Sequence, residues 1–170
     1  ERSKNSSILL LVMARPKNHK ARKSNFAKKS LGQNFLNNTQ VREDILEEAG
    51  DIAGKNNLEI GPGVVFLNSA LLKAKADLRA IEFDDRAVRI LENEFGHKEN
   101  FNLILGNFLE LELDEIFGKK AYSIIANIPY NITNPILRRV LSKTKNKPDF
   151  CIFMVQKEVA QKICNTDKRS

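Results

Sequence analysis

The chain is poor in the residues that build metal centres and disulfide frameworks. Its 170 residues include two cysteines, two histidines and no tryptophan. Cys151 and Cys164 lie in apolar surroundings without metal-ligand spacing, and His19 and His97 are isolated. The sequence therefore supports neither a disulfide framework nor a metal site, and it offers no evident cysteine or histidine nucleophile. Such cysteine usage fits a reducing, cytoplasmic location.

Long hydrophobic runs are missing near the N-terminus. The apolar run Ile8–Met13 is far shorter than the roughly 20 residues that a membrane span needs. No convincing small-residue cleavage site follows it, and the next residues are strongly basic, which argues against a signal peptide. Because the chain starts with Glu and Met13 opens a plausible basic N-terminus, we interpret residues 1–12 as lying upstream of the native start, without function.

Positive charge is concentrated at the N-terminal end of the chain. The first 42 residues hold ten Lys or Arg and one Glu, a charge of +9, which leaves −2 of the total +7 for the remainder. We predict a basic, disordered arm over residues 1–27 and one folded domain over residues 28–170. Contact with RNA or DNA is favoured over a solubilising tail. The candidate RNA-binding residues are Arg15, Lys17, Lys20, Arg22, Lys23, Lys28 and Lys29.

From residue 39 onward, helical stretches alternate with apolar runs of strand length. Thr39 can cap a helix whose apolar positions recur at helical spacing and which ends at Gly50 or Gly54. Five strand–helix units follow. Strands are predicted at 58–60, 78–82, 101–105, 122–127 and 150–155, and helices at 66–73, 86–95, 114–117, 135–141 and 157–164. This series predicts an α/β fold, with a parallel sheet covered by helices on both faces.

A glycine turn and a later acid form a nucleoside-type pattern. The first strand ends in LEIGPG and the second in IEFDD. Gly61 and Gly63 let a ligand approach the backbone, and Glu82 is placed to accept hydrogen bonds from ribose hydroxyls. Two details favour S-adenosylmethionine over NAD. Phe66 replaces the third glycine, and Glu59 would repel a pyrophosphate but suits a sulfonium and an amino group. A simple tight turn is the alternative.

The tetrapeptide Asn-Ile-Pro-Tyr at 127–130 ends the fourth predicted strand. Pro129 removes a backbone donor, so strand pairing stops at the carboxyl edge of the sheet, where ligands bind in open α/β folds. The exocyclic amine of adenine is a poor nucleophile, and the Asn127 side chain and the Ile128 carbonyl could accept its hydrogens. Tyr130 could stack on the unstacked base. In-line methyl transfer needs positioning more than a strong base. The alternative is a strand-terminating turn without a ligand.

These segments together resemble the ribosomal RNA adenine N6,N6-dimethyltransferases. The resemblance runs from about Lys28 to Ile163, and it is carried in order by KKSLGQNFL, LEIGPG, AIEFD, GNFLEL, NIPYNITNPIL and MVQKEVAQKI. The TNPIL continuation and the last segment look more like the small-subunit branch, associated with kasugamycin sensitivity, than the large-subunit branch that confers macrolide resistance. In this family the chain continues with further strands and a helical C-terminal domain, which would lie beyond Ser170.

The resemblance implies an activity and a set of partners. The fold would be a Rossmann-like class I methyltransferase fold, and the cofactor would be S-adenosylmethionine. The reaction would be dimethylation of two adjacent adenosines in a hairpin loop near the 3′ end of small-subunit rRNA. The substrate would be this rRNA or the 30S precursor particle, and the enzyme would be a cytoplasmic monomer that needs neither a metal nor a membrane.

The resemblance also implies which residues form the site. The cofactor pocket would be lined by Gln33, Asn34, Leu36, Glu59, Gly61, Gly63, Glu82, Asn107 and Asn127. Within it, Glu82 would hold the ribose and Asn107 would meet the cofactor adenine. The target amine would be held by Asn127, Ile128, Pro129 and Tyr130.

Two positions depart from the family pattern. Val65 stands where the family usually has a glycine, and a β-branched side chain there is expected to lower affinity for the methyl donor. Asn107 stands where an aspartate is usual, so an acceptor oxygen is kept but the charge-assisted bond is lost. If further strands are missing, Phe150–Val155 becomes an unprotected apolar edge, and we expect aggregation.

Other function classes stay open. A non-catalytic RNA-binding or ribosome-assembly module would keep the basic arm and the Tyr130 platform without needing a methyl donor. A large-subunit adenine methyltransferase of the macrolide-resistance type shares the GQNFL and NIPY segments. A nicotinamide oxidoreductase is disfavoured by Glu59 and Phe66.

Overall fold

The fold is known from a computed structural model, which describes residues 7–13, 39–63, 65–129 and 131–164. One six-stranded sheet has the strand order β1-β6-β5-β2-β3-β4, and every pair of neighbours is parallel. The strands are β1 (Ser7–Met13), β2 (Asn56–Ile60), β3 (Asp77–Glu82), β4 (Phe101–Leu105), β5 (Ser123–Asn127) and β6 (Phe150–Gln156). The predicted parallel α/β sheet is confirmed.

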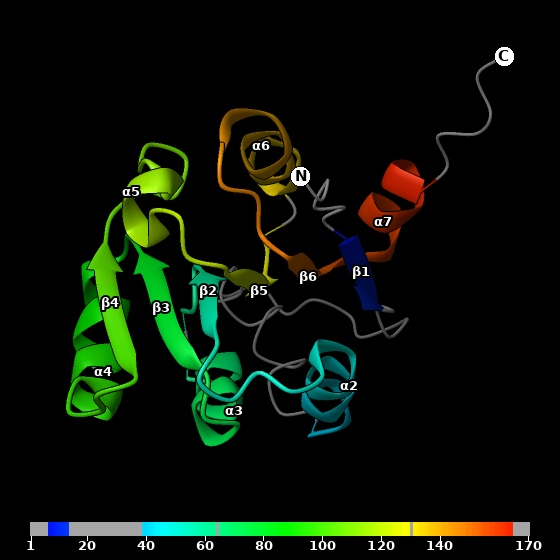
Figure 1. Cartoon of the computed structure of the whole chain (residues 1–170). Coiled ribbons are helices and arrows are strands. Elements are labelled where there is room, and N and C mark those ends of the chain that lie inside the picture. The colour runs from blue at the N-terminus through cyan, green and yellow to red at the C-terminus, as the bar shows by residue number, and fades with distance from the viewer. Residues whose placement is uncertain (1–6, 14–38, 64, 130, 165–170) are drawn as a thin grey trace, which may run out of the picture.

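Helices cover both faces of this sheet. They are α2 (Thr39–Ala49), α3 (Leu67–Lys73), α4 (Asp85–Phe95), α5 (Leu113–Phe117), α6 (Thr133–Arg138), the π-helix η1 (Arg139–Lys143) and α7 (Lys157–Cys164). In Figure 1, α5, α6 and α7 lie on one side of the strands, and α2, α3 and α4 lie on the other. Within the described residues no helix is long and apolar enough to cross a bilayer.

Each helical layer packs on its own hydrophobic cluster. Successive residues of β5 enter opposite clusters, because side chains alternate across a strand. Ile124 packs with α5, α6 and α7, whereas Ile125 packs with α2, α3 and α4. Both are fully buried. Burial on both faces explains why β5 and β6 have continuous apolar sequences rather than alternating patterns.

The ends of the first predicted helix are close to the expected ones. Helix α2 ends at Ala49, and the Gly50 backbone N–H donates to the carbonyls of Leu46 and Glu47 at 3.1 and 3.2 Å. Thr39 is the first residue within the helix, so the predicted capping position is displaced by one residue.

Strand β1 corrects two expectations about the ends of the chain. Residues 7–13 were expected to belong to a disordered arm over residues 1–27, but they form a strand that pairs with β6 in parallel, from Ser7↔Phe150 to Met13↔Gln156. The expectation that Phe150–Val155 would be an unprotected edge is also wrong, since β6 is hydrogen-bonded to β5 on one side and to β1 on the other. The physical reason is that an apolar, unpaired strand edge is a template for another extended segment.

Candidate functional site

The strand order reverses direction at β2, which makes the carboxyl end of β2 a topological switch point of the sheet. From β2 the chain proceeds outward through β3 to β4, and it then returns to place β5 on the other side of β2. In open α/β sheets, ligands bind where the strand order reverses in this way. Glu59 near the end of β2 and Asn127 at the end of β5 flank this point, and Glu82 ends the neighbouring β3.

The turn after β2 requires glycine at two positions. Gly61 has φ +60° and Gly63 has φ +57°, a left-handed conformation that side chains disfavour. The Gly61 N–H donates to the Ile81 carbonyl at 2.8 Å, which fastens the turn to β3. Val65, two residues further on, packs its half-buried side chain against the cluster beneath α2, α3 and α4.

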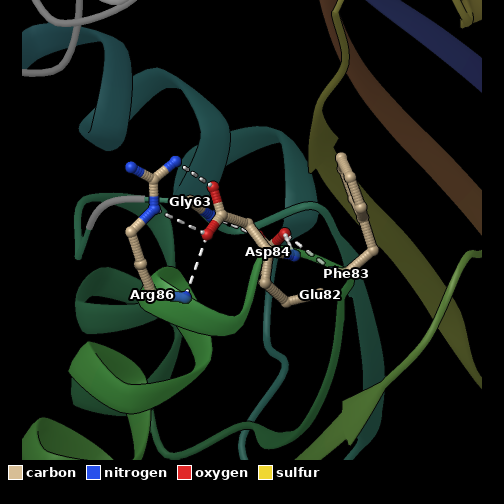
Figure 2. Close-up of polar contacts among 5 residues, drawn as sticks. All are labelled: Gly63, Glu82, Phe83, Asp84 and Arg86. Atoms are coloured by element: carbon tan, nitrogen blue, oxygen red, sulfur yellow. Dashed lines mark hydrogen bonds and ion pairs between the residues drawn. The ribbon is translucent and has the colours of Figure 1, made fainter.

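Glu82 ties the ends of β2 and β3 together. The residue is only 4% exposed. Oε2 accepts a hydrogen bond from the Gly63 N–H at 2.9 Å, and Oε1 accepts from the N–H groups of Phe83 and Asp84 at 2.9 and 3.0 Å (Figure 2). Charge-assisted bonds of this kind fix the position of the carboxylate. Because each carboxylate oxygen has two lone pairs, Oε2 can also accept from a hydroxyl.

Glu59 is a buried carboxyl group beside the same turn. Its side chain is 1% exposed, and its Oε2 has no hydrogen-bond partner among the described residues. Burial, and next the charge of Glu82, raise the pKa of Glu59 well above its usual range. A buried, unpaired carboxylate oxygen next to a glycine turn is suited to a cationic group such as an ammonium or a sulfonium.

Phe83 is a site feature that sequence reasoning missed. Its side chain is 75% exposed, although it directly follows the buried Glu82, and Figure 2 shows the ring pointing away from Arg86. The next residue, Asp84, caps α4 by accepting from the Arg86 N–H at 2.9 Å. Hydrogen bonds from Arg86 lower the pKa of Asp84. The sequence feature that could have indicated it is the position of this large apolar residue directly after Glu82, the acid predicted to bind the ribose.

The Asn-Ile-Pro-Tyr segment leaves β5 by a fixed path. Asn127 is half-buried and pairs with Met154 of β6, and the Ile128 N–H donates to the Met154 carbonyl at 3.1 Å. The Pro129 carbonyl accepts from the hydroxyl of the buried Thr133 at 3.2 Å. Within the described residues, neither the Asn127 side chain nor the Ile128 carbonyl has a partner, so both acceptors remain available to a ligand. The positioning role of Thr133 was not anticipated.

Asn107 lies in the exposed turn after β4. Its Oδ1 accepts from the Leu109 N–H at 3.1 Å, and its Nδ2 donates to Glu110 Oε1 at 2.8 Å. The amide therefore shapes the turn, and Glu110 brings a carboxylate to its side. A ligand that used Asn107 would share its oxygen with the Leu109 N–H.

The remaining predicted site residues lie outside the described part of the chain. They are Gln33, Asn34, Leu36, Tyr130 and the basic residues Arg15, Lys17, Lys20, Arg22, Lys23, Lys28 and Lys29. The structure therefore brings Glu59, Gly61, Gly63, Glu82 and Asn127 to one edge of the sheet, with Asn107 in a turn that follows β4 at this same edge.

Comparison with protein families places these features in context. The sequence model of the family described as ribosomal RNA adenine dimethylase matches residues 24–170. The chain belongs to the ribosomal RNA adenine dimethylase family. Its similar relatives include proteins named ribosomal RNA small subunit methyltransferase A. The one from Chlorobaculum parvum is 41% identical over 81% of this chain and 48% of its own length, and the one from Clostridium botulinum is 39% identical over 79% and 49%.

Solved structures agree on the fold of this chain. The 23S rRNA methyltransferase ErmE superposes with a TM-score of 0.63 and 25% identity, over 75% of this chain and 50% of that one. A dimethyladenosine transferase from Plasmodium falciparum superposes with a TM-score of 0.60 and 24% identity, over 74% and 44%. The predicted family and its Rossmann-like methyltransferase fold are confirmed. The chain spans about half the length of the curated relatives it matches.

Proposed function

We propose that this chain carries the catalytic site of an S-adenosylmethionine-dependent adenine N6,N6-dimethyltransferase that acts on small-subunit rRNA. The supporting observation is the arrangement at the carboxyl end of β2, where a buried acid, a glycine turn and two unpartnered acceptors converge. Identity near 40% to small-subunit methyltransferases favours that substrate over large-subunit rRNA. We place the reaction in the cytoplasm, on the 30S precursor particle, and expect the complete protein to act as a monomer.

The described residues fit the methyl donor. When bound, S-adenosylmethionine would supply an electrophilic methyl group on a sulfonium. Glu82 would accept hydrogen bonds from the ribose hydroxyls, and the exposed Phe83 ring would cover an apolar face of the nucleoside. The orphaned Oε2 of Glu59 is a partner of suitable charge for the amino group or sulfonium. Gln33, Asn34 and Leu36 complete the proposed pocket.

The target adenine is assigned to the end of β5. Asn127 Oδ1 and the Ile128 carbonyl would accept the two hydrogens of the exocyclic amine, which directs its lone pair toward the methyl group. Pro129 and the hydrogen bond from Thr133 to its carbonyl hold this backbone in place. Tyr130 would stack on the flipped base. Because both acceptors are neutral, this arrangement orients the amine rather than deprotonating it in advance.

RNA recognition outside the active site is assigned to the basic residues between Arg15 and Lys29. Neutralisation of phosphates by such residues gives binding that weakens as salt rises. A non-catalytic RNA-binding module remains the second candidate, since Val65 replaces a glycine in the loop that would face the cofactor.

Calorimetric titration with S-adenosylmethionine tests the proposal. The unmodified chain, Val65→Gly and Glu82→Gln would be compared, each after its fold is checked by circular dichroism. We expect the first two to bind and Glu82→Gln to bind at least about tenfold more weakly, because a charged hydrogen-bond acceptor for the ribose is lost. Methyl transfer to a hairpin fragment of small-subunit rRNA, followed by mass spectrometry, then reads out the reaction.

The outcomes separate the candidates. Binding only after Val65→Gly would identify a methyltransferase scaffold disabled at its donor loop. If none of the three folded proteins binds S-adenosylmethionine, the proposed methyltransferase function is contradicted and the RNA-binding module is favoured. Methylation of a large-subunit fragment in preference to the small-subunit one would overturn the substrate assignment.

A further inference from the structure

A hollow lined by basic residues lies outside the proposed methyl-transfer site. It has a volume of about 630 Å³ and lies between the turn after β4 and the α6–η1 segment. Its lining residues, here called the basic hollow, are Leu109, Asn134, Pro135, Arg138, Arg139 and Lys143. Three of these six side chains are cationic and none is acidic. A concave, positively charged surface of this kind is suited to an anionic group.

Arg139 is held in place by the protein. Its Nη2 donates to the Leu111 carbonyl and lies 3.5 Å from Glu112 Oε1. The side chain is only 11% exposed, and its Nε is buried without a partner among the described residues. The guanidinium therefore has donor capacity that the protein does not use. A planar guanidinium already fixed in one orientation loses little freedom when it binds an oxyanion.

Arg138 and Lys143 are exposed at the same hollow. Neither forms an ion pair with any residue that the structure describes. Glu112, the acid that approaches Arg139, is largely exposed, so solvent screens its effect. Glu110, in the turn that contains Leu109, is exposed and bound by the Asn107 amide. The positive charge of the hollow is thus mostly uncompensated. Asn134 adds an uncharged side chain that can donate to phosphate oxygens.

The position of the hollow connects it to the proposed site. Helix α6 begins at Thr133, whose hydroxyl donates to the Pro129 carbonyl. The first lining residue of this helix, Asn134, therefore comes one residue after the contact that holds the Asn-Ile-Pro-Tyr segment in place. Its other wall, Leu109, belongs to the turn shaped by Asn107. Two of the lining residues, Arg138 and Arg139, form the boundary between α6 and the π-helix η1, and Lys143 ends η1. Such π-helical turns are frequent at functional sites.

We propose that the basic hollow binds a phosphodiester group of the RNA strand beside the adenosine that enters the site at Asn127. This inference rests on the proposed function for the identity of the RNA. A flipped nucleotide leaves its backbone outside the pocket, and this backbone must follow the surface next to the opening. Arg139 and Arg138 would contact phosphate oxygens, and Lys143 would add a point charge.

The test removes the two exposed charges together. Arg138→Ala/Lys143→Ala is compared with Lys119→Ala/Lys120→Ala, which makes the same change in net charge in the segment before β5, at residues that do not line the hollow. The probe is a labelled RNA hairpin whose loop carries two adjacent adenosines, titrated at several salt concentrations. We expect the first variant to bind about tenfold more weakly than the control. The slope of log affinity against log salt should fall by about 0.7 for each phosphate group that the variant no longer neutralises.

Calorimetry with S-adenosylmethionine on the same samples separates this inference from the proposed function. Unchanged donor affinity together with weakened RNA binding in Arg138→Ala/Lys143→Ala supports the hollow. Equal RNA affinity of the two double variants overturns it, whether or not the donor binds. If the unmodified chain fails to bind the donor but the two variants still differ on RNA, the proposed function fails and the hollow stands.

Discussion

At the scale of single residues, Glu59 makes stability depend on pH. The pKa of Glu59 is raised in the folded chain, so the folded state holds the proton more tightly than the unfolded state, whose ordinary value is 4.5. The associated stabilisation is complete below that value and is lost as pH rises toward and through the raised pKa. We therefore expect the midpoint of urea unfolding to fall over this range, and to fall less in Glu59→Gln.

The same variant separates stability from binding. Glu59→Gln should be more stable than the unmodified chain at neutral pH, because no buried charge remains, yet it should bind S-adenosylmethionine more weakly. Parallel pH profiles for the two proteins would show that Glu59 is not the group responsible. Urea titrations between pH 4 and pH 8 measure this directly.

Asn107 offers a second residue-scale prediction. Asn107→Asp replaces the 2.8 Å bond from Nδ2 to Glu110 Oε1 with two neighbouring carboxylates. We expect the free energy of unfolding to fall by about 0.5 kcal/mol, since both side chains are exposed and the repulsion between them is screened. Adding Glu110→Gln should recover that loss. The double-mutant cycle is measured by urea unfolding at low salt. An Asn107→Asp variant more stable than the unmodified chain would show that the hydrogen bond between Asn107 and Glu110 does not stabilise the fold.

At the scale of elements, the turn between β2 and α3 depends on Gly63. Gly63→Ala should cost about 1 kcal/mol, because an alanine there must adopt φ +57°, although its Cβ would meet only the Gly61 carbonyl oxygen at 3.9 Å. Gly50→Ala is the matched control, with φ +65° and open space around its Cβ, away from the site. Both variants should lose similar stability in thermal unfolding, but only Gly63→Ala should lose donor affinity. Equal affinity of Gly63→Ala and Gly50→Ala for S-adenosylmethionine would contradict the role of this turn in binding the donor.

Regular elements could be predicted because their signals are local. The buried stretches of β5 and β6 are apolar on both faces, and the glycine turn and Glu82 carry a recognisable spacing. The π-helix could not be predicted, since residues 135–141 have ordinary helical spacing. The η1 carbonyls are bound by residues that follow the helix: the Thr144 hydroxyl donates to Arg139, and the Lys147 ammonium donates to Val140 and Leu141. The exposure of Phe83 also depends on the surrounding fold rather than on its neighbours in sequence.

At the scale of the whole molecule, the largest difference between sequence and structure is β1. Its apolar run is short, and local sequence contains no information about a partner more than a hundred residues away. The pairing Leu10↔Phe153 is set by the unpaired edge of β6, which accepts any extended segment that can reach it. Strands β2 to β6 could be predicted from the strand–helix units of the sequence. The edge strand β1 could not, because its place depends on pairing with a segment that is distant in the sequence.

This boundary leads to a prediction about solution behaviour. Removal of residues 1–13 would strip β1 from β6 and expose the backbone edge of FCIFMV, an apolar segment with high β-propensity and no charge. We expect that variant to aggregate at concentrations where the unmodified chain stays dispersed, as measured by light scattering. Removal of residues 1–6 alone is the control, because it ends before Ser7 and leaves the pairing intact. If both truncated proteins scatter light equally, β1 does not protect the edge of β6 from aggregation. The stability of the domain would then come from strands β2 to β6 and the two helical layers alone.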